Sequence, residues 1–404
     1  MLNPFLLMAV FYLIVAIVAA ADAALTSFGL LPWFTGLPWL RVHFITLGVF
    51  TEAAFGVLPA FLAARRGAPR PATRWDIWLL LNAGLVVLLA GVPSINPALI
   101  ITGGTLVFIA ALLLILQLRG LGFAQTPGSG SLKFYVTGLV YLLTGILVGT
   151  GLWVGWSEPL RIGVPKEVHI HANSWGFASL VFAGLLIDLA PALTAAPLAS
   201  RRTISAIFWA MALGALGLVL GPWLHGNLFA TVPGLVLHIT ATLWLLVVLV
   251  QALRRHGLFA RAGAWHLVVS YVWILLPVLM APLILLGVAN VPGADIEATA
   301  PQALVYGWML QFFYAVTPYF VARWLLRDAD ARLGGNWLSL AAVNLGSVLI
   351  WASIFLVDIR APLHAASYVL LGVSLAAAAW ETVSITMTAL RRAEQSVPQF
   401  DFSD

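Results

Sequence analysis

The chain has 404 residues, of which 62% are hydrophobic and only 9% are charged, and its mean hydropathy is +1.01. This composition excludes a soluble domain and is typical of a protein embedded in a bilayer. The absence of cysteine excludes disulfides, thiolate metal sites, iron–sulfur clusters and haem attached through Cys-x-x-Cys-His. The net charge of +5 indicates membrane topology and not nucleic-acid binding, because the basic residues lie in short loops between apolar segments.

Twelve apolar segments are long enough to span a membrane, which takes about 20 residues each. They are predicted at 4–26, 41–63, 75–95, 98–118, 133–156, 169–191, 203–224, 229–252, 264–289, 301–325, 336–357 and 363–390. The first is predicted to be a spanning helix and not a cleaved signal, because no basic region precedes it and the apolar run continues past Ala21. We therefore predict an all-α, polytopic membrane protein with a single integral membrane domain over residues 1–404.

The positions of the basic residues predict the orientation of the twelve segments. Of the 20 Lys and Arg residues, sixteen lie in the loops that follow even-numbered segments or in the C-terminal tail, and only Arg41, Arg161, Lys166 and Arg360 lie on the other side. Cytoplasmic loops carry an excess of Lys and Arg, so both termini are predicted to be cytoplasmic and the protein to lie in a cell (inner or plasma) membrane.

A pattern recurs in the second, sixth and tenth segments, at a period of about 130 residues. Each copy has a glycine and, five residues before it, a histidine or glutamine: His43 and Gly48, His171 and Gly176, Gln302 and Gly307. A second landmark has the same period, because the eighth and twelfth segments both end in Ala-Leu-Arg-Arg. These landmarks predict three parallel four-helix repeats, at about 1–130, 131–262 and 263–404.

The histidines predict a buried metal or haem site near the outer face. His43, His169 and His171 lie in the first turns of the second and sixth helices, and His238 lies about mid-membrane in the eighth. Because His169 and His171 are two residues apart on a helix, they point some 200° apart and can serve two different sites. His43 and His171 hold equivalent repeat positions, and we expect both to face the place where the second, sixth and tenth helices converge.

Simpler interpretations remain open for several of these residues. His225 and His364 lie at helix ends, where a histidine is often interfacial and solvated, and His256 is among loop arginines. The repeat glycines give room either for a flat macrocycle or only for close helix packing. Most of the 17 tryptophans are expected to be interface anchors, although Trp175 is predicted to contact a cofactor.

Twelve helices in three repeats, with His-x-His at an outer helix end and a histidine on the second helix, resemble the haem–copper oxidase subunit I superfamily, which includes terminal oxidases and nitric oxide reductases. Its members place the His-x-His on the tenth helix, whereas here it is on the sixth and the tenth carries Gln302 and Tyr306. In length and helix number the chain is also similar to the NnrS-type haem and copper membrane proteins, whose Trp-His-Ala-His-Glu segment it lacks.

The resemblance implies particular ligand roles. It implies that His43 and His171 ligate a haem iron and that His169 binds a second haem or a copper. His225 and His238 would be the copper ligands by analogy with the seventh helix of the family. The implied cofactor is b-type haem, one or two per chain, with copper as a further candidate.

Three carboxylates fall within apolar segments, where they are costly and usually mark proton or ion paths. Glu52, Asp188 and Glu381 are therefore predicted to form a proton path, although Asp188 lies near a helix end, where it would reach the headgroups.

Three functions are consistent with these features. The first is a haem-binding redox protein, leaning towards a haem-dependent oxidoreductase, that handles oxygen or nitric oxide and takes electrons from a quinol, a cytochrome or a partner subunit. The second is an NnrS-like haem or copper protein that binds a gas without turnover. The third is a colourless, proton-coupled transporter that uses Glu52 and Asp188.

Overall fold

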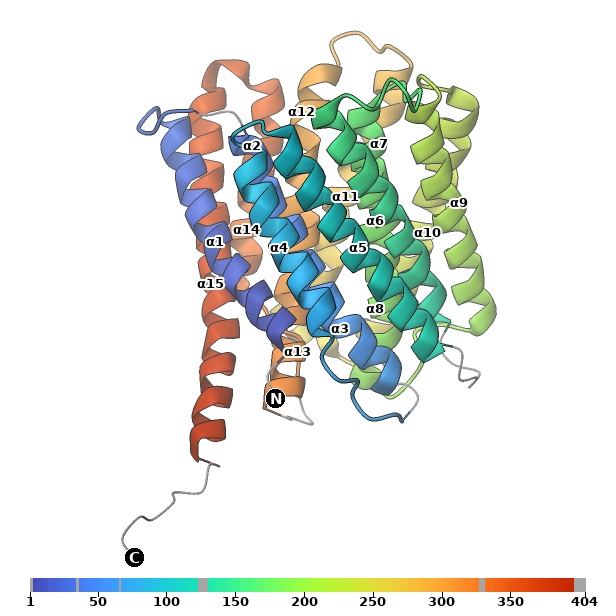
Figure 1. Ribbon diagram of the computed structural model, residues 1–404, viewed down its shortest axis with the longest axis vertical. Helices are drawn as coiled ribbons and strands as arrows, with labels where there is room; N and C mark the ends of the chain where they lie inside the picture. The colour runs from blue at the N-terminus through green and yellow to red at the C-terminus, as the bar shows by residue number, and fades with distance from the viewer. Residues whose placement is uncertain (1–2, 34–35, 65–66, 123–129, 327–330, 396–404) are drawn as a thin grey trace, which may run out of the picture.

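The computed structural model describes residues 3–33, 36–64, 67–122, 130–326 and 331–395, and within these ranges all regular structure is helical (Figure 1). Helices lie in all twelve predicted segments. In the first four they are α1 (Pro4–Ser27), the continuous run α2 (Leu37–His43), η1 (Phe44–Thr51) and α3 (Glu52–Ala64), then α4 (Trp75–Gly91) and α5 (Pro97–Gly122).

The next four segments contain α6 (Ser131–Val154), the continuous run α7 (Pro165–His171), η2 (Ala172–Ala178) and α8 (Ser179–Thr194), then α9 (Arg201–Trp223) and α10 (Leu228–Arg255). After a short turn, η3 (Leu258–Ala260), the last four contain α11 (Ala262–Leu285), the run α12 (Gly293–Ala303), η4 (Leu304–Leu310) and α13 (Gln311–Leu325), then α14 (Trp337–Phe355), η5 (Val357–Ile359) and α15 (Arg360–Gln395).

Ten of these helices, within the described ranges, are long and apolar enough to cross a membrane, which makes this a multi-pass membrane protein. Large apolar side chains are exposed on the outside of the bundle, for example Phe229 at 93% and Trp380 at 76%, as contact with lipid requires. Two predicted segments fall outside the ten. Helix α4 is shorter, and the run α12–η4–α13 is less apolar because it carries glutamines and tyrosines.

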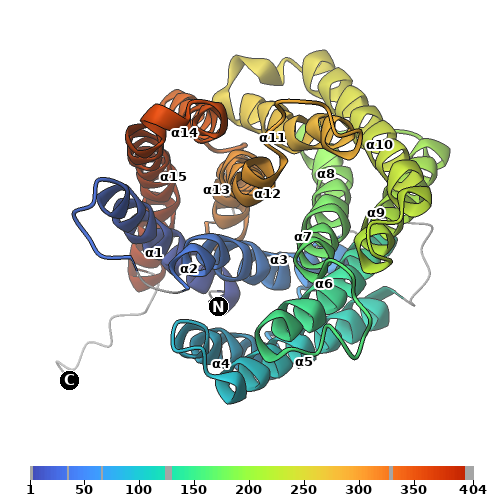
Figure 2. The same cartoon turned by 90° about the horizontal axis from the view of Figure 1, so that it is seen from above.

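Three helical runs form the interior of the bundle. The apolar windows of Leu37–Ala64 and Pro165–Thr194 are 83% buried, against 33–56% for the other eight, and every residue from 303 to 322 is buried. Figure 2 shows α12–α13 inside the ring of helices, with α3 and α8 converging on it. Burial in protein instead of lipid explains how this third run tolerates polar residues.

Phenylalanines join the three interior runs near the middle of the bundle. The ring of Phe50 in η1 lies 4.7 Å from that of Phe177 in η2 and 5.5 Å from that of Phe313 in α13. The rings of Phe182 and Phe312 stack at 3.9 Å between centroids, with planes 5° apart. Such contacts fill the centre with aromatic side chains and fix the three runs against one another.

Each interior run passes from α-helix to π-helix at the matching place, in η1, η2 and η4. The glycine of the sequence pattern lies in each π segment and packs on an aromatic ring from the helix preceding that run. A Cβ added to Gly48, Gly176 or Gly307 would lie 2.6, 2.3 or 2.4 Å from Tyr12, Tyr141 or Trp273, respectively. Of the two roles left open for these glycines, close helix packing is therefore the one observed.

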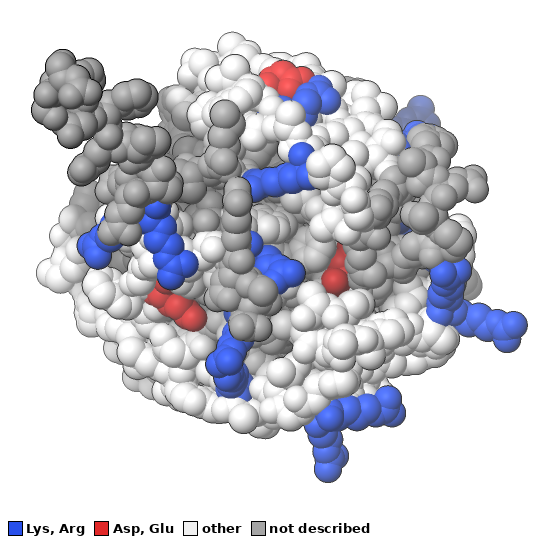
Figure 3. Space-filling view, turned by 90° about the horizontal axis from the view of Figure 1, so that it is seen from below, with Lys and Arg blue, Asp and Glu red and all other residues white. Residues whose placement is uncertain are grey.

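The two ends of the bundle differ in charge. Helix α1 begins and α15 ends at the lower end of Figure 1, whereas α2, α7 and α12 all begin at the upper end. Viewed from below, that lower face shows mostly Lys and Arg among its charged side chains (Figure 3). This distribution agrees with the loops predicted to be cytoplasmic.

Candidate functional site

Two histidines from different interior runs face each other near the upper end of the bundle. The ring centroids of His43, the last residue of α2, and His169, in α7, are 6.2 Å apart with ring planes 27° apart. With metal–nitrogen bonds of about 2.0–2.1 Å, two imidazoles that bind one metal from opposite sides have centroids about 6.4 Å apart. The observed separation of the two ring centroids, 6.2 Å, is close to that value.

Hydrogen bonds fix which ring nitrogen of each histidine is free. Nδ1 of His43 lies 2.8 Å from the carbonyl oxygen of Trp39, and Nδ1 of His169 lies 2.8 Å from that of Gly145. A carbonyl can only accept, so each Nδ1 carries the proton and donates. In the neutral ring, Nε2 then keeps its lone pair, which is the arrangement that metal-ligating histidines use.

Neighbouring side chains and glycines hold the two rings in place. The indole of Trp39 stacks on His43 at 4.2 Å, with planes 13° apart. On the other side, α6 presents Gly145 and Gly149 to α7, and a Cβ on Gly149 would lie 2.5 Å from Nδ1 of His169. Since any side chain there would displace the imidazole, these glycines set the position of His169.

The predicted pairing of His43 with His171 is not the one observed. Nδ1 of His171 donates to the carbonyl oxygen of Leu218 in α9, at 2.6 Å, on the side of α7 away from His169. The reason is rotational. His169 faces α2 and His171 faces α9, so His43 lies beside His169, two positions before the residue that the sequence pattern matches to it.

The ring of His171 is oriented like the other two, because its Nδ1 donates to a carbonyl and no hydrogen bond to its Nε2 is found among the described residues. Trp175, predicted to contact a cofactor, is 5% exposed and lies 6.5 Å from His171 between ring centroids. His238 lies beyond it, 5.4 Å from the Trp175 ring. Its bonds are reversed, since Nε2 lies 3.1 Å from the carbonyl oxygen of Trp175 and Nδ1 lies 3.3 Å from the hydroxyl of Thr242.

This reversal argues against His238 as a copper ligand through Nε2, because that nitrogen donates to Trp175. His225, its predicted copper partner, is exposed in the turn after α9, whereas His238 is buried about 15 Å further along, at 1.5 Å per residue of α10. The structure does not bring them together. No group of three or more His, Asp or Glu side chains able to hold a metal occurs in the described part of the chain.

The three predicted proton-path carboxylates lie in different surroundings. Glu52 is fully buried at the start of α3, and neither of its oxygens has a hydrogen-bond partner among the described residues. Asp188 is 2% exposed and accepts from the hydroxyl of Tyr135 at 2.6 Å. Glu381 accepts from the backbone N–H of Gly335 at 2.9 Å. Glu52 alone lies in the same interior run as His43, about two turns below it.

A polar cluster at the upper end was not anticipated from the sequence. Arg41 is 7% exposed, forms an ion pair with Asp22 at 3.1 Å, and places its guanidinium carbon 5.6 Å from the ring centroid of Tyr368. Tyr368 donates a short hydrogen bond to Oε1 of Gln302. His364, expected at a solvated interface, is half-buried with Nε2 2.7 Å from the hydroxyl of Ser353. The one sequence signal near this cluster is the recurring pattern, which matches Gln302 to His43.

No protein-family model matches the chain, and no curated protein matches its sequence. The site is therefore interpreted from its own geometry.

Proposed function

We propose that this chain is a haem-binding membrane redox protein of the haem–copper oxidase-like type, with twelve spans in three repeats, which handles oxygen or nitric oxide and electrons near the outer membrane face. The observation that carries the proposal is the pair His43 and His169, facing each other at 6.2 Å with both Nδ1 atoms bound to carbonyls. The pair would hold a haem iron from both sides.

The small number of protein ligands favours haem over a bare metal ion. Structural zinc and comparable sites take three or four protein ligands, whereas this site supplies two nitrogens. A haem brings four donors of its own, so His43 and His169 would be enough to hold it. Copper remains a second candidate for the same pair, because imidazole also suits copper.

The three-repeat arrangement is supported by features that recur at one period. They are the π segments η1, η2 and η4, the glycine in each, and the aromatic ring on which that glycine packs. If each repeat is rotated about the bundle axis relative to the one before it, a space between two neighbouring interior runs, here called a cleft, is bordered by one residue from each of those two runs. The three pairs are then His43 with His169, His171 with Ala300, and Gln302 with Arg41.

The second of these clefts favours a role in gas binding. His171 has a free Nε2, and by the repeat register a small alanine, Ala300, takes the place opposite it. His171 would be the one histidine to hold a haem there, and that haem would supply binding of oxygen or nitric oxide. A protein that binds a gas in this way without turnover, like the NnrS type, is the second candidate function.

The protein's own part in the chemistry is orientation and proton handling. Carbonyls from Trp39, Gly145 and Leu218 keep the histidines in the ligating tautomer and at fixed angles. When bound, the haem would supply one-electron transfer and gas binding. Glu52 would hold a proton in the interior run below His43, since an unpaired carboxylate in a bilayer is costly and usually functional.

The test is an absorption spectrum of the detergent-purified protein, oxidised and reduced with dithionite, with haem extraction and metal analysis on the same sample. A sharp reduced α-band from one or two b-type haems per chain is the expected result. Carbon monoxide binding would then test whether a haem held by His171 can bind a gas. A protein that stays colourless and metal-free after expression with ample haem would overturn the proposal and leave proton-coupled transport as the function to test.

A further inference from the structure

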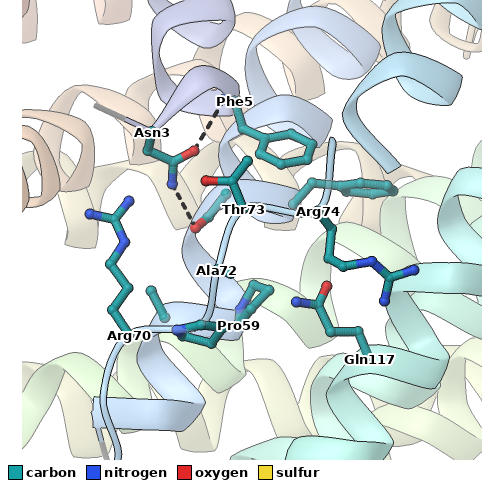
Figure 4. A pocket seen from close by; sticks show the side chains of 12 residues that line it. Asn3, Phe5, Pro59, Arg70, Ala72, Thr73, Arg74 and Gln117 are labelled. Atoms are coloured by element: carbon teal, nitrogen blue, oxygen red, sulfur yellow. Dashed lines mark hydrogen bonds between the residues drawn. The ribbon is translucent and has the colours of Figure 1, made fainter. Parts of the chain in front are cut away.

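A pocket at the lower end of the bundle is lined by two arginines and by no acidic residue. It is a cavity of about 30 Å³ beneath α1, α3 and α5, open to the surface. Figure 4 shows Arg70 and Arg74 on opposite sides of it, with Ala72 and Thr73 between them and Pro59 below. Gln117 of α5 completes the polar wall. A pocket with this charge is complementary to an anion.

The two arginines differ in what they already bind. Arg74 holds Asp76, with Nε 2.8 Å from one carboxylate oxygen and a terminal nitrogen 2.5 Å from the other. Arg70 has no acidic partner among the described residues, and its guanidinium carbon lies 5.7 Å from the ring centroid of Trp324. Arg70 is therefore the cation available to a ligand.

The local sequence holds Arg70 in position. It lies between Pro69 and Pro71, and both the proline rings and the restriction on a residue that precedes proline limit the backbone to extended conformations. Burial lowers the pKa of the Arg70 guanidinium, which nevertheless stays charged at neutral pH. Taken as a whole, Arg70 is exposed, so its charged guanidinium is available for two-point hydrogen bonding with a phosphate.

The rest of the pocket is apolar. Phe5, Phe55, Pro59 and Ala60 line its side towards the bundle core. The side-chain amide of Asn3 already makes two hydrogen bonds within the protein. It donates to the carbonyl oxygen of Gly56 at 3.0 Å and accepts from the N–H of Phe5 at 3.1 Å. Phe5, Phe55, Pro59 and Ala60 are themselves buried and close the inner side of the pocket, so a phospholipid would place its phosphate at the arginines and keep its glycerol and acyl carbons at the open, outer side.

We propose that this pocket binds the phosphate of an anionic phospholipid, with Arg70 as its principal contact and Thr73 and Gln117 as further hydrogen-bond donors. Its place suits this ligand, because basic pockets between spanning helices on the cytoplasmic side recognise anionic headgroups. The site is independent of the histidines at the upper end and of any haem.

The experiment is native mass spectrometry of the full-length protein in detergent, titrated separately with short-chain phosphatidylglycerol, short-chain phosphatidylcholine and inorganic phosphate. We compare the wild type with Arg70→Gln and with Arg254→Gln, a control that removes an exposed arginine at the lower end of α10. Phosphatidylglycerol should bind the wild type and Arg254→Gln equally and should bind Arg70→Gln about tenfold more weakly, the effect of one charged hydrogen bond.

Three outcomes would overturn the proposal. Equal losses in both variants would mean diffuse attraction to the basic face, equal binding of both lipids would mean no anion selectivity, and displacement of lipid by millimolar phosphate would make the free ion the ligand. If Arg70→Gln does not elute as a folded protein, Thr73→Val, which replaces the hydroxyl by a methyl group of similar size, takes its place and should weaken phosphatidylglycerol binding without affecting phosphatidylcholine binding.

Discussion

The imidazoles of His43 and His169 face each other across the boundary between two interior runs, and each is fixed through Nδ1 by a backbone carbonyl. One carbonyl, that of Trp39, comes from the same helix as its histidine, and the other, that of Gly145, comes from the neighbouring α6. Both Nε2 atoms are left as lone-pair donors. The relationship makes His169, and not His171, the partner of His43.

Substitution of the three histidines one at a time should separate these two pairings. If haem binds as proposed, His43→Ala and His169→Ala should each abolish its six-coordinate spectrum, because each variant lacks one of the two histidines that would hold the iron. His171→Ala should keep that spectrum and lose only the carbon monoxide-binding component. Reduced-minus-oxidised spectra and electron paramagnetic resonance of the purified variants measure this.

His238→Gln is the matched control for that series, since His238 is buried but its Nε2 donates to a carbonyl. Loss of the six-coordinate signal in His171→Ala, with retention in His169→Ala, would contradict the pairing seen in the structure.

The packing of each repeat glycine on an aromatic ring should be essential for folding. A Cβ on Gly176 would lie 2.3 Å from the Tyr141 ring, so Gly176→Ala should destabilise the protein by about 1–3 kcal/mol, the usual cost of overpacking. Thermal unfolding in detergent, followed by loss of monodisperse protein, measures the effect.

The double variant Gly176→Ala with Tyr141→Leu supplies the control, because the smaller side chain relieves the contact. It should recover part of the stability lost in the single glycine variant, by comparison with Tyr141→Leu alone. Additive losses would show that the glycine is needed for some other reason.

The sequence was sufficient to predict the helices but not the pairing of the ligands. Apolar length located helical segments of which ten, among the described residues, are long and apolar enough to span a membrane, and the sequence pattern located Gly48, Gly176 and Gly307, each of which lies in a π segment. The sequence could not show that His43 faces His169 and not His171, because that depends on the rotation of one helix relative to another. The sequence also could not predict the tautomers of His171 and His238, because they depend on carbonyl groups of other helices.

Removing one partner of the Arg41–Asp22 ion pair should cost more stability than replacing both partners. The side chain of Arg41 is 9% exposed and that of Asp22 is 28% exposed, so Arg41→Met leaves a partly buried carboxylate without its partner. Arg41→Met should therefore destabilise the protein by about 1–3 kcal/mol, less than breaking a fully buried pair costs. The double variant Arg41→Met with Asp22→Asn should be more stable than Arg41→Met alone.

Thermal unfolding of the four proteins in a double-mutant cycle measures this coupling. A double variant less stable than Arg41→Met would show that Asp22 stabilises the fold through some other contact.

Glu52 should matter for proton coupling and not for folding. It is fully buried without a hydrogen-bond partner among the described residues, and its repeat equivalent in the tenth segment is Gln311, also fully buried. Glu52→Gln keeps the shape of the side chain and removes its capacity for charge, so the variant should fold with unchanged or higher stability.

If Glu52 takes up a proton when the proposed haem between His43 and His169 is reduced, the midpoint potential of the haem should depend on pH in the wild type. That dependence should be weaker in Glu52→Gln. Redox titration at several pH values measures the slope, with Asp188→Asn as the comparison, because Asp188 already accepts from Tyr135. Equal slopes in the wild type and Glu52→Gln would remove Glu52 from any proton path, and a Glu52→Gln protein that fails to fold would instead assign the carboxylate a structural role.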